Sequence, residues 1–383
     1  MTDKLKSPQQ IATQFLQRNG FFSYLNHSSF QVKADQSIKQ IFKSDYPYCL
    51  ELKTTNKKVQ KNNQLQYCLE LGGTYLYCYA FKQKNNKIEI IKQFTTSFYS
   101  KKTYTPEIFF SELTKQLIKL SVSSDLSNIS ELTLVLAFPI QPIITKTHLL
   151  DGKLLAFGKN HQQNKLINSE IGKNWSKYLL KNHQLAIKIN ILNDSNSSLL
   201  AGISKQSSPQ PIINLIVGTG TNISLALPNS RSLKLYNLEF GKYDLFPYSN
   251  FDLQLQQETS QTTNYNTEKL FAGAWQNHLF RIMHQQLITD QIIDKKNFPI
   301  KLYAKSSAFQ LETYFTHQST NPSFQILKIC WQAISLRGAY LSAFTTSRLI
   351  IQLQKKSPPN RSDFRKSRGQ LKKNLWQRCY HTD

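Results

Sequence analysis

The chain has 383 residues, of which 40% are hydrophobic and 12% aromatic, and its formal net charge is +25. This composition excludes disorder over most of the length, and a prior of about 150 residues per domain suggests two or three domains. The longest apolar run, residues 132–140, is far shorter than the roughly 18 to 20 residues that cross a bilayer, so we expect no membrane span.

The N-terminus and the cysteines indicate the compartment. Residues 1–15 lack the basic and apolar regions of a secretory signal, so no export is expected. The five cysteines are odd in number and never spaced as CxxC, which indicates neither a disulfide framework nor a zinc site. We therefore expect a protein of the reducing cytoplasm.

The strong positive charge has two interpretations. A basic chain can bind nucleic acid or an anionic surface through phosphate contacts alone. Lys, Asn, Gln and Ser are nevertheless spread along the whole chain as solvated surface, and only residues 351–383 concentrate the charge. We expect no nucleic-acid partner for the main function, and a contact of this basic tail with nucleic acid or anionic lipid stays the alternative.

The first part of the chain divides into a polar segment and a β-rich one. Residues 1–60 contain one amphipathic stretch, at 11–18, and are treated as a poorly specified leader. Three β-prone segments follow at 67–73, 74–81 and 87–98, and their alternation predicts three antiparallel strands.

Clear end signals mark the next elements. Thr105 and Pro106 are an N-cap and a first-turn proline, and they predict a helix with one apolar face made of Phe109, Leu113, Leu117 and Leu120. The apolar run at 132–140 predicts a buried strand. Asp151 and Gly152, between two apolar segments, predict a type I′ hairpin turn.

A similar order of elements then follows. Helical spacing predicts a helix at 168–180, and alternation predicts a strand at 186–194 that runs into a polar turn. Residues 212–226 predict two strands around a glycine turn, and helices are expected at 267–288 and 324–346. We therefore expect two related halves.

Glycine-rich turns join apolar strands at two places. Glycine lets the backbone approach a ligand closely, and such a turn points backbone N–H groups outward. These N–H groups can therefore bind phosphate oxygens. Ordinary hairpins use the same turn, so neither one assigns a site alone. The residues are Gly72, Gly73 and Thr74 in the first turn and Gly218, Thr219, Gly220 and Thr221 in the second.

A series of short motifs stands in one order along the chain. The motifs are LELGGT at 69–74, LAFPIQ at 136–141, FGK at 157–159, LNDSNSSLLAG at 192–202, VGTGTN at 217–222, NLEFG at 237–241, EKLFAG at 268–273 and CWQAISLRGAYLSA at 330–343. Together they resemble the hexokinase family. The resemblance implies an α/β, actin-like ATPase fold with two ribonuclease-H-like lobes and a cleft between them.

The resemblance also implies a division of the chain. Residues 61–192 would form a small lobe and residues 193–350 a large lobe, with the leader at 1–60 before them and the basic tail at 351–383 after them.

Single residues acquire roles through the same resemblance. Asp194 would be the general base that accepts the proton of a sugar 6-hydroxyl as it attacks the γ-phosphate of ATP. Taken alone, the Asn-Asp pair has another interpretation, a turn that bonds its own backbone. The sugar would be held by Lys159, Asn193, Asn222, Glu239 and Glu268, and the residues of the two glycine turns would line the phosphates of ATP.

The implied activity is hexokinase-like transfer from Mg-ATP to a hexose, with glucose as the first expectation, at the start of glycolysis. Fructose and mannose stay open. The chain departs from the family at several positions: Glu70 replaces an aspartate and would approach Mg²⁺ through water. Tyr75 and Tyr77 stand where asparagine and arginine are expected. Ala137 replaces a serine and Gly158 a threonine.

The largest departure follows Ile351. The family continues with an Asp-Gly-Ser strand, a His-Pro segment and a Gly-Ser-Gly-Lys-Gly-Ala turn. This chain has none of them and continues instead with a Pro-containing basic sequence. We expect a shortened or frame-altered terminus. The alternative function is therefore a degenerate family member that binds sugar with weak or no catalysis.

Overall fold

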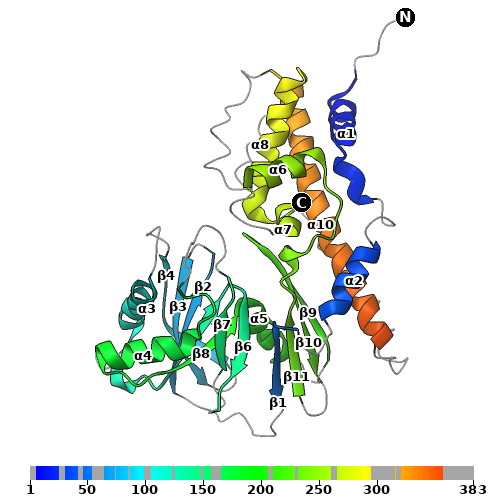
Figure 1. The fold of residues 1–383 in the computed structure, drawn as a ribbon. Coiled ribbons are helices and arrows are strands. Elements are labelled where there is room, and N and C mark those ends of the chain that lie inside the picture. The colour runs from blue at the N-terminus through cyan, green and yellow to red at the C-terminus, as the bar shows by residue number, and fades with distance from the viewer. Residues whose placement is uncertain are drawn as a thin grey trace, which may run out of the picture.

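The structure is a computed structural model. It describes residues 6–25, 31–41, 46–53, 64–73, 75–84, 87–98, 105–122, 126–146, 150–156, 165–205, 210–228, 232–259, 265–294, 315 and 321–356. Two β-sheets lie side by side, and helices gather at one end of the second sheet (Figure 1). We call the part around the first sheet the first lobe and the rest the second lobe. No helix among these residues is long and apolar enough to cross a membrane.

A five-stranded sheet is the centre of the first lobe. Its strand order is β4-β3-β2-β5-β8, in which β2, β3 and β4 are antiparallel and β5 and β8 run parallel to β2. The predicted three-stranded meander is therefore confirmed. The strands span Leu65–Leu71 (β2), Tyr75–Lys84 (β3), Lys87–Ser97 (β4), Glu131–Leu136 (β5) and Lys188–Asn193 (β8).

Helices α3 (Pro106–Leu120) and α4 (Ile171–His183) pack into the core of this lobe. Thr105 caps α3 as predicted, because its side chain accepts a hydrogen bond from the amide of Ile108. The predicted apolar face of α3 is buried in full. Trp175 of α4 is completely buried, and its indole N–H donates to Thr114 of α3 at 3.0 Å.

The predicted hairpin turn at Asp151 and Gly152 is wrong. Both residues lie inside strand β7 (Leu150–Leu154), which pairs with β6 (Ile140–Ile144). The buried carboxylate of Asp151 accepts hydrogen bonds from the amides of Gly172 and Lys173, at 2.7 and 3.0 Å. An aspartate is needed here because it satisfies N–H groups in the first turn of α4.

A four-stranded antiparallel sheet supports the second lobe. Its order is β1-β11-β10-β9. The predicted strands around the second glycine turn are thus confirmed, and among the described residues no parallel strand continues this sheet. The bounds are Cys49–Lys53 (β1), Ile212–Val217 (β9), Thr221–Pro228 (β10) and Ser232–Asn237 (β11).

Helices make most of the second lobe's core. The predicted helix at 267–288 is divided into α7 and α8, and the one at 324–346 is longer, so that α10 includes the first residues of the expected basic tail. The elements are η4 (Phe240–Lys242), α6 (Asn250–Thr259), α7 (Asn266–Lys269), α8 (Gly273–Thr289) and α10 (Pro322–Lys356); the short η3 (Leu126–Asn128) lies in the first lobe.

The described residues of the expected leader are part of the second lobe. They form α1 (Pro8–Arg18), η1 (Phe21–Leu25), α2 (Gln31–Ile41) and strand β1. Helices α1 and α2 pack against α10, and β1 pairs with β11 (Figure 1). The interpretation of these residues as a poorly specified leader is corrected, because Ala12, Phe15 and Leu16 bury an apolar face of α1.

A buried ion pair fixes these helices to one another. Arg337 of α10 donates to both carboxylate oxygens of Asp252 in α6, at 2.8 and 2.9 Å, and to the carbonyl of Leu270 at 2.8 Å. The guanidinium also lies 4.3 Å from the ring centroid of Phe21. Bidentate pairing and a third acceptor compensate for the burial of this charge.

Helix α5 (Asp194–Ile203) connects the two sheets. It begins directly after β8 of the first lobe and packs against β9, β10 and β11 of the second. A small apolar cluster holds it there, with Leu199 of α5 against Ala226 and Leu235. The polar turn predicted at Asp194 is wrong, because Asn193 caps a helix that starts at Asp194.

Candidate functional site

Asn193 stands at the point where β8 ends. Its side-chain amide donates to the carbonyls of Leu136 and Phe138, at 3.2 and 3.0 Å, and its oxygen accepts from the amide of Ser195 at 2.9 Å. These bonds attach the end of β5 to the start of α5. Asn193 therefore places its neighbour Asp194, and a contact of Asn193 with sugar stays a prediction.

Asp194 is a carboxylate in an environment that disfavours its charge. Its side chain accepts from the amide of Ser195 at 2.7 Å. Burial raises the pKa of Asp194 to about 6, the hydrogen bonds from Ser195 oppose this, and the charges of Glu239 and Glu70 raise it further. A carboxylate with such a pKa is ionised near neutral pH and still basic enough to take a proton.

Glu70 lies at the end of the first lobe's sheet, and its charge acts on Asp194. It lies on β2, one residue before the strand ends, where it faces Val135 of β5 and Tyr77 of β3. Burial raises the pKa of Glu70, and its charge acts on Asp194. The first glycine turn and the proposed base thus belong to one region.

A chain of amides joins Asp194's helix to the second sheet. Asn222 of β10 donates to the hydroxyl of Ser195 at 2.9 Å and to the side-chain oxygen of Asn237 at 2.7 Å. Asn237, at the end of β11, donates in turn to Glu239 at 2.7 Å. The structure therefore brings together three of the predicted residues, Asp194, Asn222 and Glu239.

Glu239 is buried and has a left-handed backbone, with φ 47° and ψ 42°. Burial raises the pKa of Glu239, while Lys242 and the hydrogen bond from Asn237 lower it. The Lys242 ammonium lies 3.5 Å from the carboxylate and donates to the hydroxyl of Tyr48 at 2.9 Å. The sequence did not predict these two residues: Lys242 directly follows the NLEFG motif, whereas Tyr48 carries no sequence signal.

Glu268 lies beside Glu239, and its charge raises the pKa of that group. Its two oxygens accept from the amide of Thr221 and the indole of Trp275, both at 3.3 Å. Gly241 packs closely on it, because an added Cβ would lie 3.1 Å from the Glu268 Cβ. The predicted carboxylates therefore form one group, held by backbone and side-chain donors.

The two glycine turns differ in how they are held. In the first, the amide of Gly72 donates to the carbonyl of Tyr75 at 2.9 Å. In the second, the carbonyls of Gly218 and Thr219 accept from the first amides of α8, those of Gly273 and Ala274, at 2.8 and 3.1 Å. An added Cβ at Gly73 or Gly218 would meet nothing within 4 Å, so both turns have open space beside them.

Some predicted residues lie outside the described part of the chain. These are Thr74 of the first turn, Lys159 of the sugar segment, and the departure at Gly158. Most of the basic tail, from residue 357 on, lies outside it as well.

The donor set suits a magnesium ion that is shared with a nucleotide. Within the described ranges, no three His, Cys, Asp or Glu side chains gather as a metal site. Mg²⁺ is commonly bound through one or two carboxylates, water and substrate phosphates, so such a cluster is not required. Glu70, whose charge acts on Asp194, is a carboxylate that fits this role through water, and Asp194 stays free to accept a proton.

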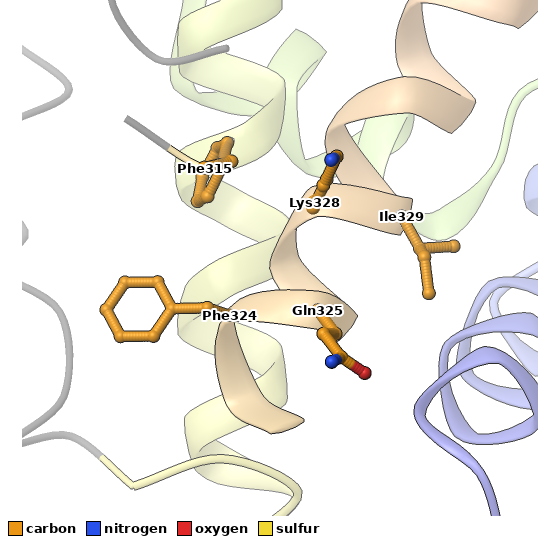
Figure 2. A pocket seen from close by; sticks show the side chains of 5 residues that line it. All are labelled: Phe315, Phe324, Gln325, Lys328 and Ile329. Atoms are coloured by element: carbon orange, nitrogen blue, oxygen red, sulfur yellow. The ribbon is translucent and has the colours of Figure 1, made fainter. Parts of the chain in front are cut away.

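A separate hollow lies away from these carboxylates. It has a volume of about 300 Å³ and is found where α10 begins beside α8 (Figure 2). Its lining residues are Phe315, Phe324, Gln325, Lys328 and Ile329. None of them belongs to the group described above.

Comparison with known proteins gave one family and a set of solved structures. The family model described as Hexokinase matches residues 212–369. That stretch contains the second glycine turn, Asn222, Glu239 and Glu268, and it also enters the expected basic tail. No curated protein matches the chain significantly.

The structural likeness extends over nearly the whole chain. Hexokinase from Schistosoma mansoni, complexed with glucose, is 16% identical, with 91% of this chain and 86% of that chain covered and a TM-score of 0.70. A second solved hexokinase is 14% identical with the same coverage and a TM-score of 0.57. The expected α/β, actin-like ATPase fold with two lobes is thereby confirmed.

Proposed function

We propose that the chain is a member of the hexokinase family, whose model matches residues 212–369, and that it transfers the γ-phosphoryl group of Mg-ATP to the 6-hydroxyl of a hexose. Glucose is the hexose we propose first, since the S. mansoni hexokinase with the similar fold is complexed with glucose. One observation carries the proposal. Asp194 is a half-buried carboxylate with its pKa raised to about 6, at the place where the two sheets meet.

The proposed roles follow from the positions of the side chains. Asp194 accepts the proton of the attacking hydroxyl, and its pKa is close to the working pH that general-base catalysis favours. Glu239, Glu268 and Asn222 accept and donate hydrogen bonds to the other hydroxyls, because a polyol needs several fixed partners. Asn193 keeps Asp194 in place through its bonds to β5.

The nucleotide would be held at the two glycine turns. Their open space leaves room for phosphate oxygens, and glycine lets the backbone approach them. Glu70 would hold Mg²⁺ through water, and the ion would neutralise charge on the phosphates when it is bound.

A coupled assay with glucose and ATP tests the proposal. We expect Asp194→Asn to lower kcat by about a hundredfold or more, because an amide cannot accept the proton. Asp244→Asn is the matched control: it makes the same change at an exposed aspartate that bonds Tyr248. Equal rates for the wild type and Asp194→Asn would remove the proposed base.

A second candidate is a family member that binds sugar with weak or no catalysis. It is favoured by the bonds inside the glycine turns: the amide of Gly72 donates to Tyr75, and the amide of Gly218 donates to Gly220, each at 2.9 Å. Each bond uses an N–H group that a phosphate would need. Calorimetric titration separates the candidates, because glucose binding without ATP binding supports the second and binding of both supports the first.

A further inference from the structure

The ammonium of Lys242 lies beside Glu239, one of the carboxylates of the candidate site. Lys242 is about one-third exposed at 31%, whereas its partner Glu239 is 9% exposed, and the two are 3.5 Å apart. A cation beside a carboxylate can have two effects. It can block the carboxylate from other partners, or it can keep the carboxylate ionised and pointed in one direction. The surrounding bonds favour the second.

The carboxylate of Glu239 has a fixed direction. Its left-handed backbone is a conformation that costs on the order of 1 kcal/mol for a residue with a side chain, so the surrounding bonds must hold it. The amide of Glu239 donates to Asn237 at 3.2 Å, and its carbonyl accepts from the amide of Lys242 at 3.0 Å. One carboxylate oxygen accepts from Asn237, and the other faces Lys242.

The ammonium is itself held by aromatic residues. The hydroxyl of Tyr48 accepts from it at 2.9 Å, and the ring centroids of Tyr48 and Tyr265 lie 5.0 and 5.5 Å away. Tyr46 fixes the turn that carries Tyr48, because its hydroxyl donates to the carbonyls of Asn237 and Leu238, both at 2.9 Å. A flexible lysine thereby acquires one position.

We propose that Lys242 is a positioning residue that aims the carboxylate of Glu239 at the sugar, and that Tyr48 keeps the Lys242 ammonium in place. This rests on the proposed function, since it assumes that Glu239 binds sugar. With one donor on each oxygen from Asn237 and Lys242, the remaining lone pairs of the carboxylate are left for sugar hydroxyls.

The charge state of Glu239 decides whether its carboxylate can accept hydrogen bonds from sugar hydroxyls. Burial and Glu268 raise the pKa of Glu239, and Lys242 and Asn237 lower it. Loss of the Lys242 charge therefore raises this pKa further, and a larger fraction of Glu239 is protonated at a given pH. The ionisable groups that face Glu239 are Lys242 on η4, Glu268 on α7, Asp194 on α5, and the phenols of Tyr46, Tyr243 and Tyr265.

Glucose titration by calorimetry over about pH 6 to pH 9 tests the proposal. For Lys242→Met we expect the Kd to rise about tenfold at the acidic end, the factor that one unit of pKa gives, and the deficit to shrink as the pH rises. Lys242→Arg should restore most of the affinity, and Tyr48→Phe should lose less than Lys242→Met. Lys234→Met is the matched control, because Lys234 forms an exposed pair with Glu51 at the same 3.5 Å.

A second measurement keeps the inference separate from the proposed function. Carbon-13 NMR of labelled glutamate carboxyls reports the pKa of Glu239 without any sugar, and Glu239→Gln assigns its signal. We expect a higher pKa in Lys242→Met than in Lys234→Met. An unchanged pKa, or a glucose deficit that does not vary with pH, overturns the role of Lys242. A wild type that binds no glucose overturns the proposed function, while the pKa comparison still shows whether Lys242 keeps Glu239 ionised.

Discussion

Asp252, which is buried in the second lobe, and Asp194, which is half-buried between the lobes, have opposite environments. Asp252 accepts two bonds from Arg337 and further bonds from the amide and hydroxyl of Ser249. Asp194 accepts only from Ser195 within the described structure, and the charges of Glu70 and Glu239 act against its ionised form. The first arrangement stabilises a core, and the second leaves a carboxylate with a raised pKa.

The difference shows what a buried charge can be used for. A fully paired carboxylate contributes to structure and has no capacity left for a substrate. A carboxylate among other acids is unfavourable for stability, and raised pKa values of this kind cluster at functional sites. We therefore expect loss of the cation that pairs with Asp252 to lower stability, and removal of the charge of Asp194 to raise it.

The largest effect is expected for Arg337→Met. This change leaves Asp252 buried without its cation, so we expect the free energy of unfolding to fall by about 3 to 5 kcal/mol. Urea denaturation measures it. Arg281→Met is the control, because Arg281 pairs with Glu258 near the surface, where a pair contributes about 0 to 1 kcal/mol. Equal losses in the two variants would contradict the assignment of Arg337 as a structural anchor.

For Asp194→Asn we expect the free energy of unfolding to rise rather than fall. The folded-state pKa is about 6 and the ordinary value is 3.8. Below the lower value the carboxyl is neutral in both states; as the pH rises to about 6 the unfolded chain ionises first, and the wild type loses stability. Above this range we expect the free energy of unfolding of Asp194→Asn to exceed that of the wild type by about 2 kcal/mol. One pKa unit corresponds to about 1.4 kcal/mol, and partial solvent access reduces the total.

Denaturant unfolding at several pH values measures this gain. The gain should grow between the two pKa values and then become constant. A gain that is independent of pH would mean that the amide improves packing or hydrogen bonding rather than removing an unfavourable charge, and it would break the comparison with Asp252.

Local signals account for what the sequence predicted correctly. The meander of β2, β3 and β4 follows from alternation between neighbours in sequence, and α3 follows from the Thr105-Pro106 start. Asp151 misled the prediction because its carboxylate bonds the amide of Gly172, 21 residues further along. Residues 1–60 misled it because a polar surface hides the few apolar residues that α1 buries.

The candidate site likewise contains residues that the sequence predicted and residues that it did not. Asp194, Asn222, Glu239 and Glu268 follow from motifs in sequence, and the structure places them in one region. Lys242 depends on a contact with Tyr48 that spans 194 residues, so no short pattern could predict it. Which donors already occupy each carboxylate is equally a property of the folded chain.

The smallest effects sharpen a second comparison, between the two glycine turns. An added Cβ at Gly273 would lie 2.8 Å from the carbonyl oxygen of Gly218, and this atom is backbone that can move only with the turn. We therefore expect Gly273→Ala to lower the free energy of unfolding on the order of 1 kcal/mol. The same substitution at Gly73 meets nothing within 4 Å, and there we expect a change within about 0.5 kcal/mol.

Thermal unfolding of the two variants gives the comparison directly, and ATP titration adds a second readout. If the second turn is built into the fold through α8, Gly273→Ala weakens ATP binding together with stability. Gly73→Ala then affects ATP binding alone, because its Cβ would enter the open space that we assign to phosphate. Equal stability losses at the two positions would show that the first turn is anchored as firmly as the second.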